Sequence, residues 1–114
     1  MAQRMASYII LWEFQVKGSQ ENQFERVYGP QGDWTRFFAN GEGYLGTELH
    51  RDLRKPGRYV TVDFWTSQAA YEAFRERHAA EYRSLDLKCE ALTEQESPLG
   101  VFEPVGPLAK FKQA

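Results

Sequence analysis

Four side chains in the middle of the chain are of types that transfer protons or bind aromatic compounds. The segment Tyr59–Trp65, YVTVDFW, is rich in β-branched and aromatic residues, which predicts a strand. Asp63 and Trp65 are two positions apart in it, so their side chains are expected on the same face. Tyr71 follows at the start of a segment with helical periodicity, and His50 lies in the preceding strand-like segment. Burial beside aromatic rings raises the pKa of an aspartate, which then accepts a proton from a phenol, and histidine titrates near neutral pH. These four residues are the catalytic candidates.

Each catalytic candidate has a structural alternative. A tryptophan at a strand end is commonly a core residue, and the Tyr71 hydroxyl can reach solvent while its ring packs. Asp63 can form a salt bridge with Arg51 or Arg58 across a hairpin, and His50 can be an exposed strand residue. A titratable group that faces a pocket favours an enzyme, whereas solvated or salt-bridged groups favour a binding module.

Further aromatic residues and one histidine are candidates for the wall of the same pocket. The helix after Trp65 is expected to be capped by Thr66 or Ser67, and its aromatic residues recur every three or four positions as far as Tyr82. The segment 29–34, GPQGDW, is expected to be either a lid over the pocket or a loop that places Trp34 in the core. The substrate-binding candidates are Trp12, Tyr28, Trp34, Phe38, Tyr59, Phe74 and His78.

Periodicity and turn residues predict the remaining elements. Strands are expected at 7–17, 44–53, 59–65 and 99–102, and a hairpin turn is expected at 54–57. Helices are expected at 20–28, from 66 or 67 to 82 and at 84–94, and a further short helix is expected to follow a cap at Asp33. In strand 44–53, Leu45, Thr47 and Leu49 alternate with Tyr44, Gly46, Glu48 and His50. The order β-α-β-β-α-β predicts an α+β, ferredoxin-like antiparallel sheet with its helices on one face. Because the strands carry apolar groups on both faces, a second copy is expected to cover the other face, giving a homodimer.

Composition excludes several classes of function. The chain has 114 residues and a net charge of −2, which predicts a single domain over residues 1–114, with a core at about 7–104 and a tail at 105–114. Both signs of charge are interspersed, so no surface for nucleic acid or for an anionic membrane is predicted. The early apolar run 8–12 is too short for a signal segment or a membrane span. A single cysteine, Cys89, favours the cytoplasm, and the spacing of cysteine and histidine predicts no metal site.

These patterns resemble the antibiotic biosynthesis monooxygenase (ABM) family of dimeric α/β-barrel proteins. The resemblance rests on the opening hydrophobic strand, a helix ending in aromatics and the segment GYLGTELHRDLRKPGRYVTVDFWTSQAAYEAF, and it covers roughly residues 8–102. It implies cofactor-free oxidation of a small aromatic or quinol-like substrate, in which a substrate anion donates an electron to O2. Trp65 and Tyr71 match two pocket positions of the family. An asparagine expected just before that tryptophan has no match here, where Thr61 and Asp63 occupy the neighbourhood.

Two other functions are compatible with this resemblance. One is a non-catalytic ligand-binding or dimerisation module on the same fold. The other is haem degradation, which a further branch of the same scaffold carries out with an asparagine on the first strand, a helical tryptophan and a histidine ligand. Here those positions hold Leu11 and Phe74, and His78 comes too early in the sequence, so haem degradation is the weaker prediction.

Overall fold

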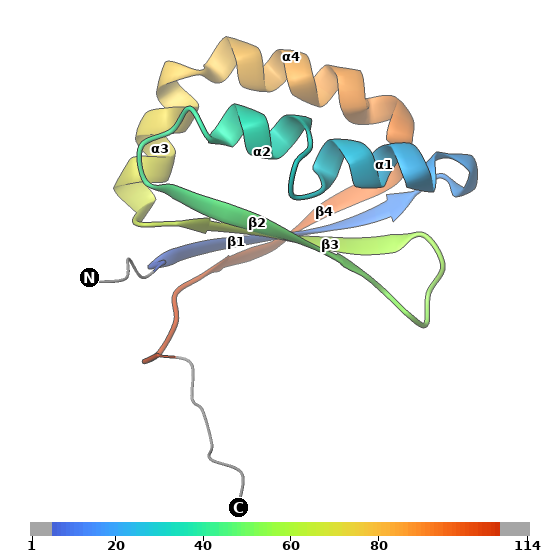
Figure 1. The fold of residues 1–114 in the computed structure, drawn as a ribbon, viewed down its shortest axis with the longest axis horizontal. Coiled ribbons are helices and arrows are strands. Elements are labelled where there is room, and N and C mark those ends of the chain that lie inside the picture. Colours follow the sequence, from blue (N-terminus) through green and yellow to red (C-terminus); the bar gives the residue numbers. More distant parts are fainter. Residues whose placement is uncertain (1–5, 108–114) are drawn as a thin grey trace, which may run out of the picture.

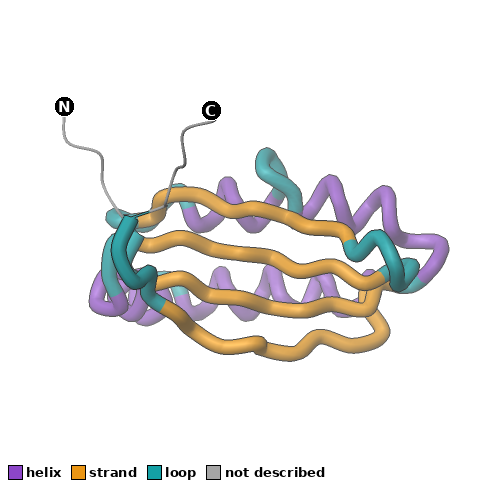
Figure 2. Tube along the Cα trace, turned by 90° about the horizontal axis from the view of Figure 1, so that it is seen from below, coloured by secondary structure: helices purple, strands orange, loops and turns teal. Residues whose placement is uncertain are grey.

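The computed structural model describes residues 6–107 and has an α+β, ferredoxin-like fold. The elements are β1 (Tyr8–Val16), a 3-10 turn (Gly18–Gln20), α1 (Glu21–Tyr28), α2 (Asp33–Phe38), β2 (Tyr44–Arg51), β3 (Arg58–Trp65), α3 (Gln68–Arg77), α4 (Ala79–Cys89), a second 3-10 turn (Glu90–Leu92) and β4 (Thr93–Phe102). All the helices lie above one face of the sheet (Figure 1). Figure 2 shows the opposite sheet face without helical cover.

The sheet is antiparallel throughout, with the strand order β2-β3-β1-β4. Strands β1 and β3 are therefore central, and their pairing sets Trp12 opposite Thr61 and Ile10 opposite Asp63. Residues directly opposite each other in a ladder share a face of the sheet. The register thus places the two apolar residues of β1 beside the two polar residues of β3, on one patch of the sheet.

Alternation along β3 identifies the face that carries the core. Tyr59, Thr61, Asp63 and Trp65 are buried beneath the helices, whereas the residues between them are only half-buried. The predicted grouping of these four residues on one face is therefore correct. Aromatic rings dominate the core around them, with Phe24, Trp65 and Tyr59 among the most deeply buried side chains.

Strand β2 departs from the expected alternation. A bulge at Leu45 shifts the register, so that Tyr44 pairs with Trp65 while Thr47 pairs with Asp63. Tyr44 and Thr47 consequently lie on the same, helix-covered face, and the prediction that Tyr44 shares a face with His50 is wrong. Gly46, which follows the bulge, has a φ of 141°, a value that residues with a Cβ rarely adopt. The strand also ends at Arg51 instead of the predicted Leu53.

The expected helix from Ser67 to Tyr82 is two helices. Ser67 caps α3 as predicted, since its Oγ accepts a hydrogen bond of 3.0 Å from the amide of Ala70. The chain then breaks at His78, whose φ of −114° and ψ of 30° are not helical, and α4 runs in a new direction across the top of the molecule (Figure 1). Because of this break, Tyr71 and Tyr82 approach the sheet from different helices.

The C-terminal elements differ from the prediction in their bounds. The apolar repeat of Leu85, Cys89 and Leu92 is packed against the core as expected, but the helix ends at Cys89 and strand β4 begins at Thr93, not at Leu99. The polar first half of β4 has no apolar alternation that would identify it as a strand. It pairs with the second half of β1 through backbone hydrogen bonds, which depend little on side-chain type.

The start of α2 differs by one residue from the prediction. The sequence predicts Asp33 as the cap of this helix, but the cap position is Gly32 and Asp33 is the first helical residue. The predicted tail at 105–114 lies outside the described residues from 108 onward. In the described part of the chain, no helix is both long and apolar enough to cross a bilayer.

Substitution of Ser67 by alanine tests the cap of α3. We expect Ser67→Ala to lower the free energy of unfolding by about 1 kcal/mol, because an amide of the first turn loses its acceptor. Urea unfolding followed by circular dichroism measures the change. Ser84→Ala, at an exposed position inside α4, is the control, and it should be neutral or slightly stabilising because alanine favours helix. Equal effects of the two substitutions would contradict the capping role.

Candidate active site

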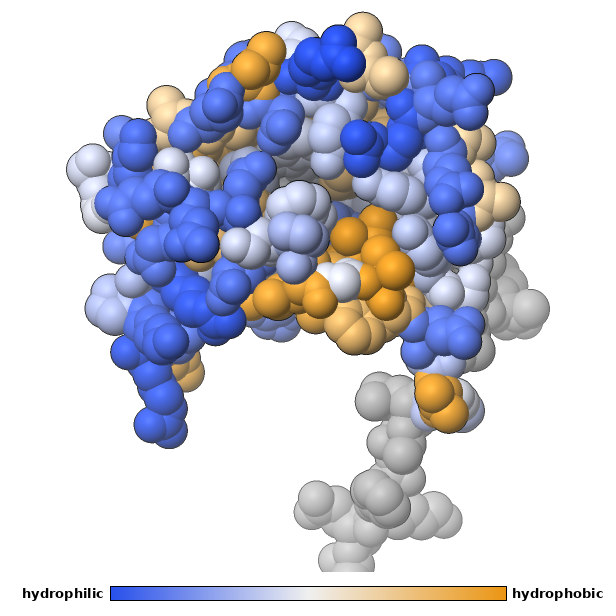
Figure 3. Space-filling view, turned by 180° about the vertical axis from the view of Figure 1, so that it is seen from behind, coloured by the Kyte–Doolittle hydropathy of each residue, from blue (hydrophilic) through white to orange (hydrophobic). Residues whose placement is uncertain are grey.

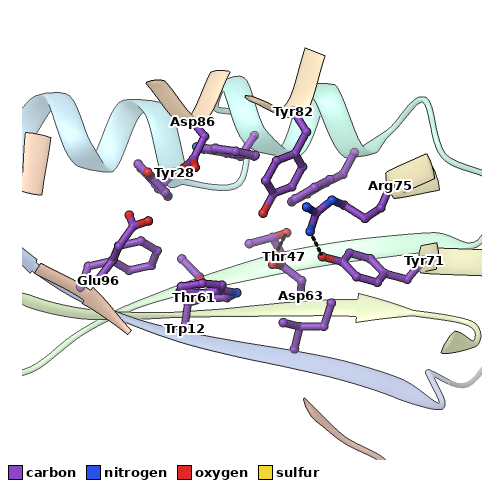
Figure 4. Close-up of a pocket in the computed structure, with 14 residues that line it drawn as sticks. Trp12, Tyr28, Thr47, Thr61, Asp63, Tyr71, Arg75, Tyr82, Asp86 and Glu96 are labelled. Atoms are coloured by element: carbon purple, nitrogen blue, oxygen red, sulfur yellow. Dashed lines mark hydrogen bonds between the residues drawn. The ribbon is translucent and has the colours of Figure 1, made fainter. Parts of the chain in front are cut away.

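A cavity of about 270 Å³ lies between the helices and the helix-covered face of the sheet. Figure 3, which views the molecule from behind, shows a hollow in its surface with apolar side chains gathered beside it. Figure 4 shows the polar lining residues, which come from the sheet below and from α1, α3 and α4 above. The lining consists of Ile10, Trp12, Phe14, Tyr28, Trp34, Phe38, Thr47, Thr61, Asp63, Tyr71, Arg75, Tyr82, Asp86 and Glu96.

Asp63 is the buried carboxylate of this cavity, with 8% of its surface exposed. Burial raises its pKa to about 6, opposed by the hydrogen bond that Thr47 donates to the carboxylate. The alternative of a salt bridge is wrong: Arg51 pairs with Glu25, and Arg58 pairs with Glu13 and Asp52. Among the described residues no cation pairs with Asp63, so near neutral pH the site holds a desolvated carboxylate that is a stronger base than an ordinary aspartate.

Two hydroxyl groups hold the Asp63 carboxylate in place. The Thr47 Oγ1 donates to the Asp63 Oδ1 at 2.6 Å, and the Tyr44 hydroxyl lies 2.5 Å from the same Thr47 oxygen. Since the Thr47 proton is directed to the carboxylate, Tyr44 is the donor in the second bond. Burial raises the pKa of Tyr44 to about 12, so it remains protonated. The bulge in β2 makes this chain of hydroxyls possible, because it brings Tyr44 to the face of Thr47.

Arg75 provides the cation of the cavity. Its guanidinium carbon lies 3.6 Å from the centroid of the Tyr82 ring, and its Nη1 donates to the Tyr71 hydroxyl at 2.9 Å. In Figure 4 the guanidinium and the Tyr82 hydroxyl both point toward the space above Thr47 and Asp63. Burial raises the pKa of the Tyr82 hydroxyl, which keeps it protonated as a hydrogen-bond donor.

The opposite end of the cavity is acidic. Asp86 of α4 and Glu96 of β4 line it together with Tyr28 (Figure 4). Burial, followed by the charges of Asp86 and Glu90, raises the pKa of Glu96. A ligand that fills the cavity therefore meets a cation at one end and carboxylates at the other.

The structure brings six of the sequence-predicted site residues into the lining. They are Trp12, Tyr28, Trp34, Phe38, Asp63 and Tyr71. Trp34 packs in the core against Tyr82 at 5.1 Å between ring centroids and also faces the cavity, so the segment 29–34 places it inside the molecule.

Two predicted residues lie behind the lining. Trp65 is fully buried, with its ring 5.3 Å from that of Tyr71 and 5.4 Å from that of Phe74. A Cβ at Gly41 would lie within 3.0 Å of both Trp65 and Phe74, so the turn after α2 also packs directly on these rings. Trp65 and Phe74 thus support the cavity wall from behind, as the core-residue alternative for Trp65 anticipated.

Three predicted residues are not brought to the cavity. His50 lies on the uncovered face of the sheet, where its exposed imidazole contacts Glu48 at 3.0 Å. The hydroxyl of Tyr59 is bound to glutamates of α1, at the other end of the core. His78 stands at the junction of α3 and α4 against the Phe74 ring, 4.8 Å between centroids. His50 lies away from the cavity because side chains alternate between the two faces after the bulge in β2, and His50 pairs with Val60 on the uncovered face.

Sequence reasoning missed the polar residues contributed by neighbouring elements. The sequence pattern groups Thr47 with Leu45 and Leu49 on one strand face, and it does not identify Arg75, Tyr82, Asp86 or Glu96 as site residues. A signal for Arg75 was present: it follows Tyr71 by one helical turn, so the two side chains share a helix face. No such signal existed for Glu96, whose strand was not recognised. Within residues 6–107, no group of three or more histidine, cysteine or acidic side chains is arranged to hold a metal ion.

The sequence profile of the antibiotic biosynthesis monooxygenase family matches residues 7–82. The chain belongs to this family. No curated protein matches the chain. Among solved structures, SnoaB, a cofactor-independent oxygenase from Streptomyces nogalater, is similar with a TM-score of 0.74 at 22% identity, over 92% of this chain and 99% of that one.

Two further solved structures show how widely the fold is used. A candidate antibiotic biosynthesis monooxygenase from Deinococcus radiodurans has a TM-score of 0.71 at 11% identity, over 92% of this chain and 99% of that one. The haem-degrader MhuD from Mycobacterium tuberculosis, with two haems in its active site, has a TM-score of 0.66 at 20% identity, over 90% and 99% of the two chains. At these identities the likeness shows the fold alone.

The buried carboxylate predicts an unusual dependence of stability on pH. The pKa of Asp63 is about 6 in the folded chain against 3.8 for an ordinary aspartate, so its contribution to stability is complete below about pH 4 and is lost as pH rises through 6. We expect Asp63→Asn to raise the free energy of unfolding near pH 8 by up to about 3 kcal/mol, and to have little effect near pH 4. Urea unfolding at both pH values measures this difference.

Asp52→Asn is the matched control for that experiment. The amide of Arg54 and then the Arg58 guanidinium hold the pKa of Asp52 below its usual range, so the ionised form stabilises the hairpin. Its replacement should destabilise the protein near pH 8, opposite in sign to Asp63→Asn. A destabilising Asp63→Asn at that pH would contradict the description of Asp63 as a desolvated, unpaired carboxylate.

Proposed function

We propose that this chain is a cofactor-independent monooxygenase or oxidase that acts on a small aromatic or quinol-like substrate. The observation that carries the proposal is a carboxylate, Asp63, that is buried in a cavity of aromatic side chains and has no cationic partner among the described residues. Such a group is suited to remove a proton from a weakly acidic phenol or anthrone. The family membership of the chain supports an activity of the monooxygenase type.

The proposed reaction begins with proton transfer from the substrate to Asp63. The resulting aromatic anion passes one electron to O2, and the substrate radical and superoxide combine to form a peroxide anion. Asp63 returns its proton to that anion, and loss of water leaves a carbonyl group, so that one CH2 and one O2 give one C=O and one H2O. In this scheme the aromatic wall orients the ring system and excludes water, while Thr47 keeps the carboxylate in position.

Oxygen consumption by the metal-stripped protein tests the proposal. With a panel of anthrones and hydroquinones, we expect uptake above autoxidation and a fall of roughly 10²–10⁴-fold in kcat/KM for Asp63→Asn, because the base is lost. For the wild type, kcat/KM should rise with pH through about 6 and then level off, since the free enzyme must hold Asp63 ionised.

Glu42→Gln, at an exposed position in the turn before β2 and outside the cavity lining, is the matched control and should retain the wild-type rate. An unchanged rate in Asp63→Asn would reject Asp63 as the base. Uptake no faster than autoxidation across the panel, combined with fluorescence quenching by the same compounds, would instead identify a non-catalytic binding module. Haem degradation is not proposed, because neither of the two described histidines lines the cavity.

We also propose that two copies pack sheet to sheet. The uncovered face carries a group of apolar side chains on β1, β3 and β4: Ile9, Leu11, Val60, Val62, Phe64 and Phe102. Half of the Phe102 side chain is exposed, and no helix covers this face (Figure 2). Burial of such a surface stabilises association by about 25 cal/mol per Å² before the costs of association. The cytoplasm is the proposed compartment, supported by the single, buried cysteine.

The oligomeric state tests this second proposal. We expect sedimentation equilibrium to give the mass of a dimer for the wild type and of a monomer for Val62→Glu, because an unpaired carboxylate would be buried between the sheets. Leu87→Glu, at an exposed apolar position of α4, is the control and should remain dimeric. A monomeric wild type, or a dimeric Val62→Glu, would contradict packing through this face.

A further inference from the structure

Arg75 is held by aromatic residues and not by an acidic partner. Its guanidinium lies over the Tyr82 ring and donates to the Tyr71 hydroxyl, so two neighbouring side chains fix its position. In the described part of the chain it forms no ion pair, whereas Arg36, Arg51 and Arg58 all pair with carboxylates. The positive charge of Arg75 is therefore not neutralised by direct contact with a carboxylate.

The hydrogen-bonding capacity of Arg75 is also incompletely used. A guanidinium carries five N–H donors, and the described contacts account for the one that Nη1 donates to Tyr71. The group lines the cavity and points into the space above Asp63 and Thr47 (Figure 4). A planar donor set of this kind binds an oxyanion through short, charge-assisted hydrogen bonds.

The titratable groups nearest Arg75 come from α3, from α4 and from the sheet. Tyr71 lies on the same helix, Tyr82 and Asp86 lie on α4, and Asp63 faces it from the sheet. Asp86 lines the cavity without an ion pair to Arg75, and no ion pair joins Arg75 to Asp63 within residues 6–107. A base and a cation thus line the same cavity without direct contact, which leaves room for a ligand between them.

We propose that Arg75 is a catalytic residue that binds the oxygen of the substrate anion, with the neighbouring Tyr82 hydroxyl as a second donor. This inference rests on the proposed oxidation and specifies its substrate: an aromatic compound whose acidic position is conjugated to a phenol or ketone oxygen. Asp63 takes the proton, and the negative charge that develops on the oxygen is met by Arg75. Stabilisation of the anion lowers the barrier to its formation and keeps it available for O2.

The same arrangement sets the orientation of the substrate. The anionic oxygen lies toward α3, and the far end of the ring system lies toward Asp86 and Glu96. Acidic substituents at that far end are disfavoured by the two carboxylates, whereas hydroxyl or amino donors are favoured. The accepted substrates are accordingly acidic at one end only.

Binding of a monohydroxyanthraquinone, whose phenol and phenolate absorb at different wavelengths, tests the assignment without turnover. Spectrophotometric titration of the bound compound gives its pKa in the wild type, in Arg75→Gln and in Arg77→Gln. We expect the wild type to lower the pKa of the ligand by about one unit or more relative to Arg75→Gln, because the cation favours the phenolate. Arg77→Gln removes an exposed charge from the same helix, outside the cavity lining, and should behave as the wild type.

Oxygen uptake provides the second readout. With an anthrone that the wild type oxidises, kcat should fall about 10²-fold in Arg75→Gln, and Arg75→Lys should recover part of it because the charge is kept. A lowered ligand pKa that requires Arg75, in a protein that shows no oxygen uptake, would support the anion site and reject the proposed oxidation. A ligand pKa that is the same in the wild type and Arg75→Gln, or failure of the wild type to bind the phenolate, would overturn the assignment.

Discussion

The desolvation of the Asp63 carboxylate is the constraint on which the rest of the site depends. A carboxylate that is exposed to water keeps the low pKa of an ordinary aspartate. Here burial raises the pKa of Asp63 to about 6, which makes it a better base. The fold maintains this unfavourable arrangement because the surrounding rings pack against one another: Phe38 of the cavity lining contacts Trp65 and Phe74, which lie behind it and also contact each other. Stability lost at one residue is thus offset by an aromatic core that belongs to the whole sheet–helix interface.

The pair of hydroxyl groups beside Asp63 depends on an irregularity in the neighbouring strand β2. In a regular β2, Tyr44 and Thr47 would point to opposite faces, and the pair of hydroxyls beside the carboxylate would not exist. The bulge at Leu45, followed by Gly46, turns Tyr44 onto the helix-covered face. Bulges commonly occur beside active sites for this reason, since one extra residue redirects a side chain without altering the fold.

The sequence was sufficient for the fold class, because alternation in β1 and β3 and the Pro-Gly hairpin are strong local signals. It also named Asp63, Trp12 and Tyr71 as candidates for one pocket, and all three line the same cavity. It did not locate Glu96 or Thr47. The strand that carries Glu96 is defined by its pairing with β1, and Thr47 shares a face with Tyr44 only because of the bulge in β2. Neither effect is encoded in a local pattern of residue types.

Both edges of the sheet are irregular, and this limits how copies of the chain can associate. Strand β2 carries the bulge at Leu45, while β4 contains Pro98, which has no amide hydrogen, and a shift of register beside it. A regular edge is a template on which another strand can add, and successive additions give open-ended fibres. The irregular edges disfavour such growth. The apolar sheet face is therefore flanked on both sides by edges on which open-ended strand addition is disfavoured.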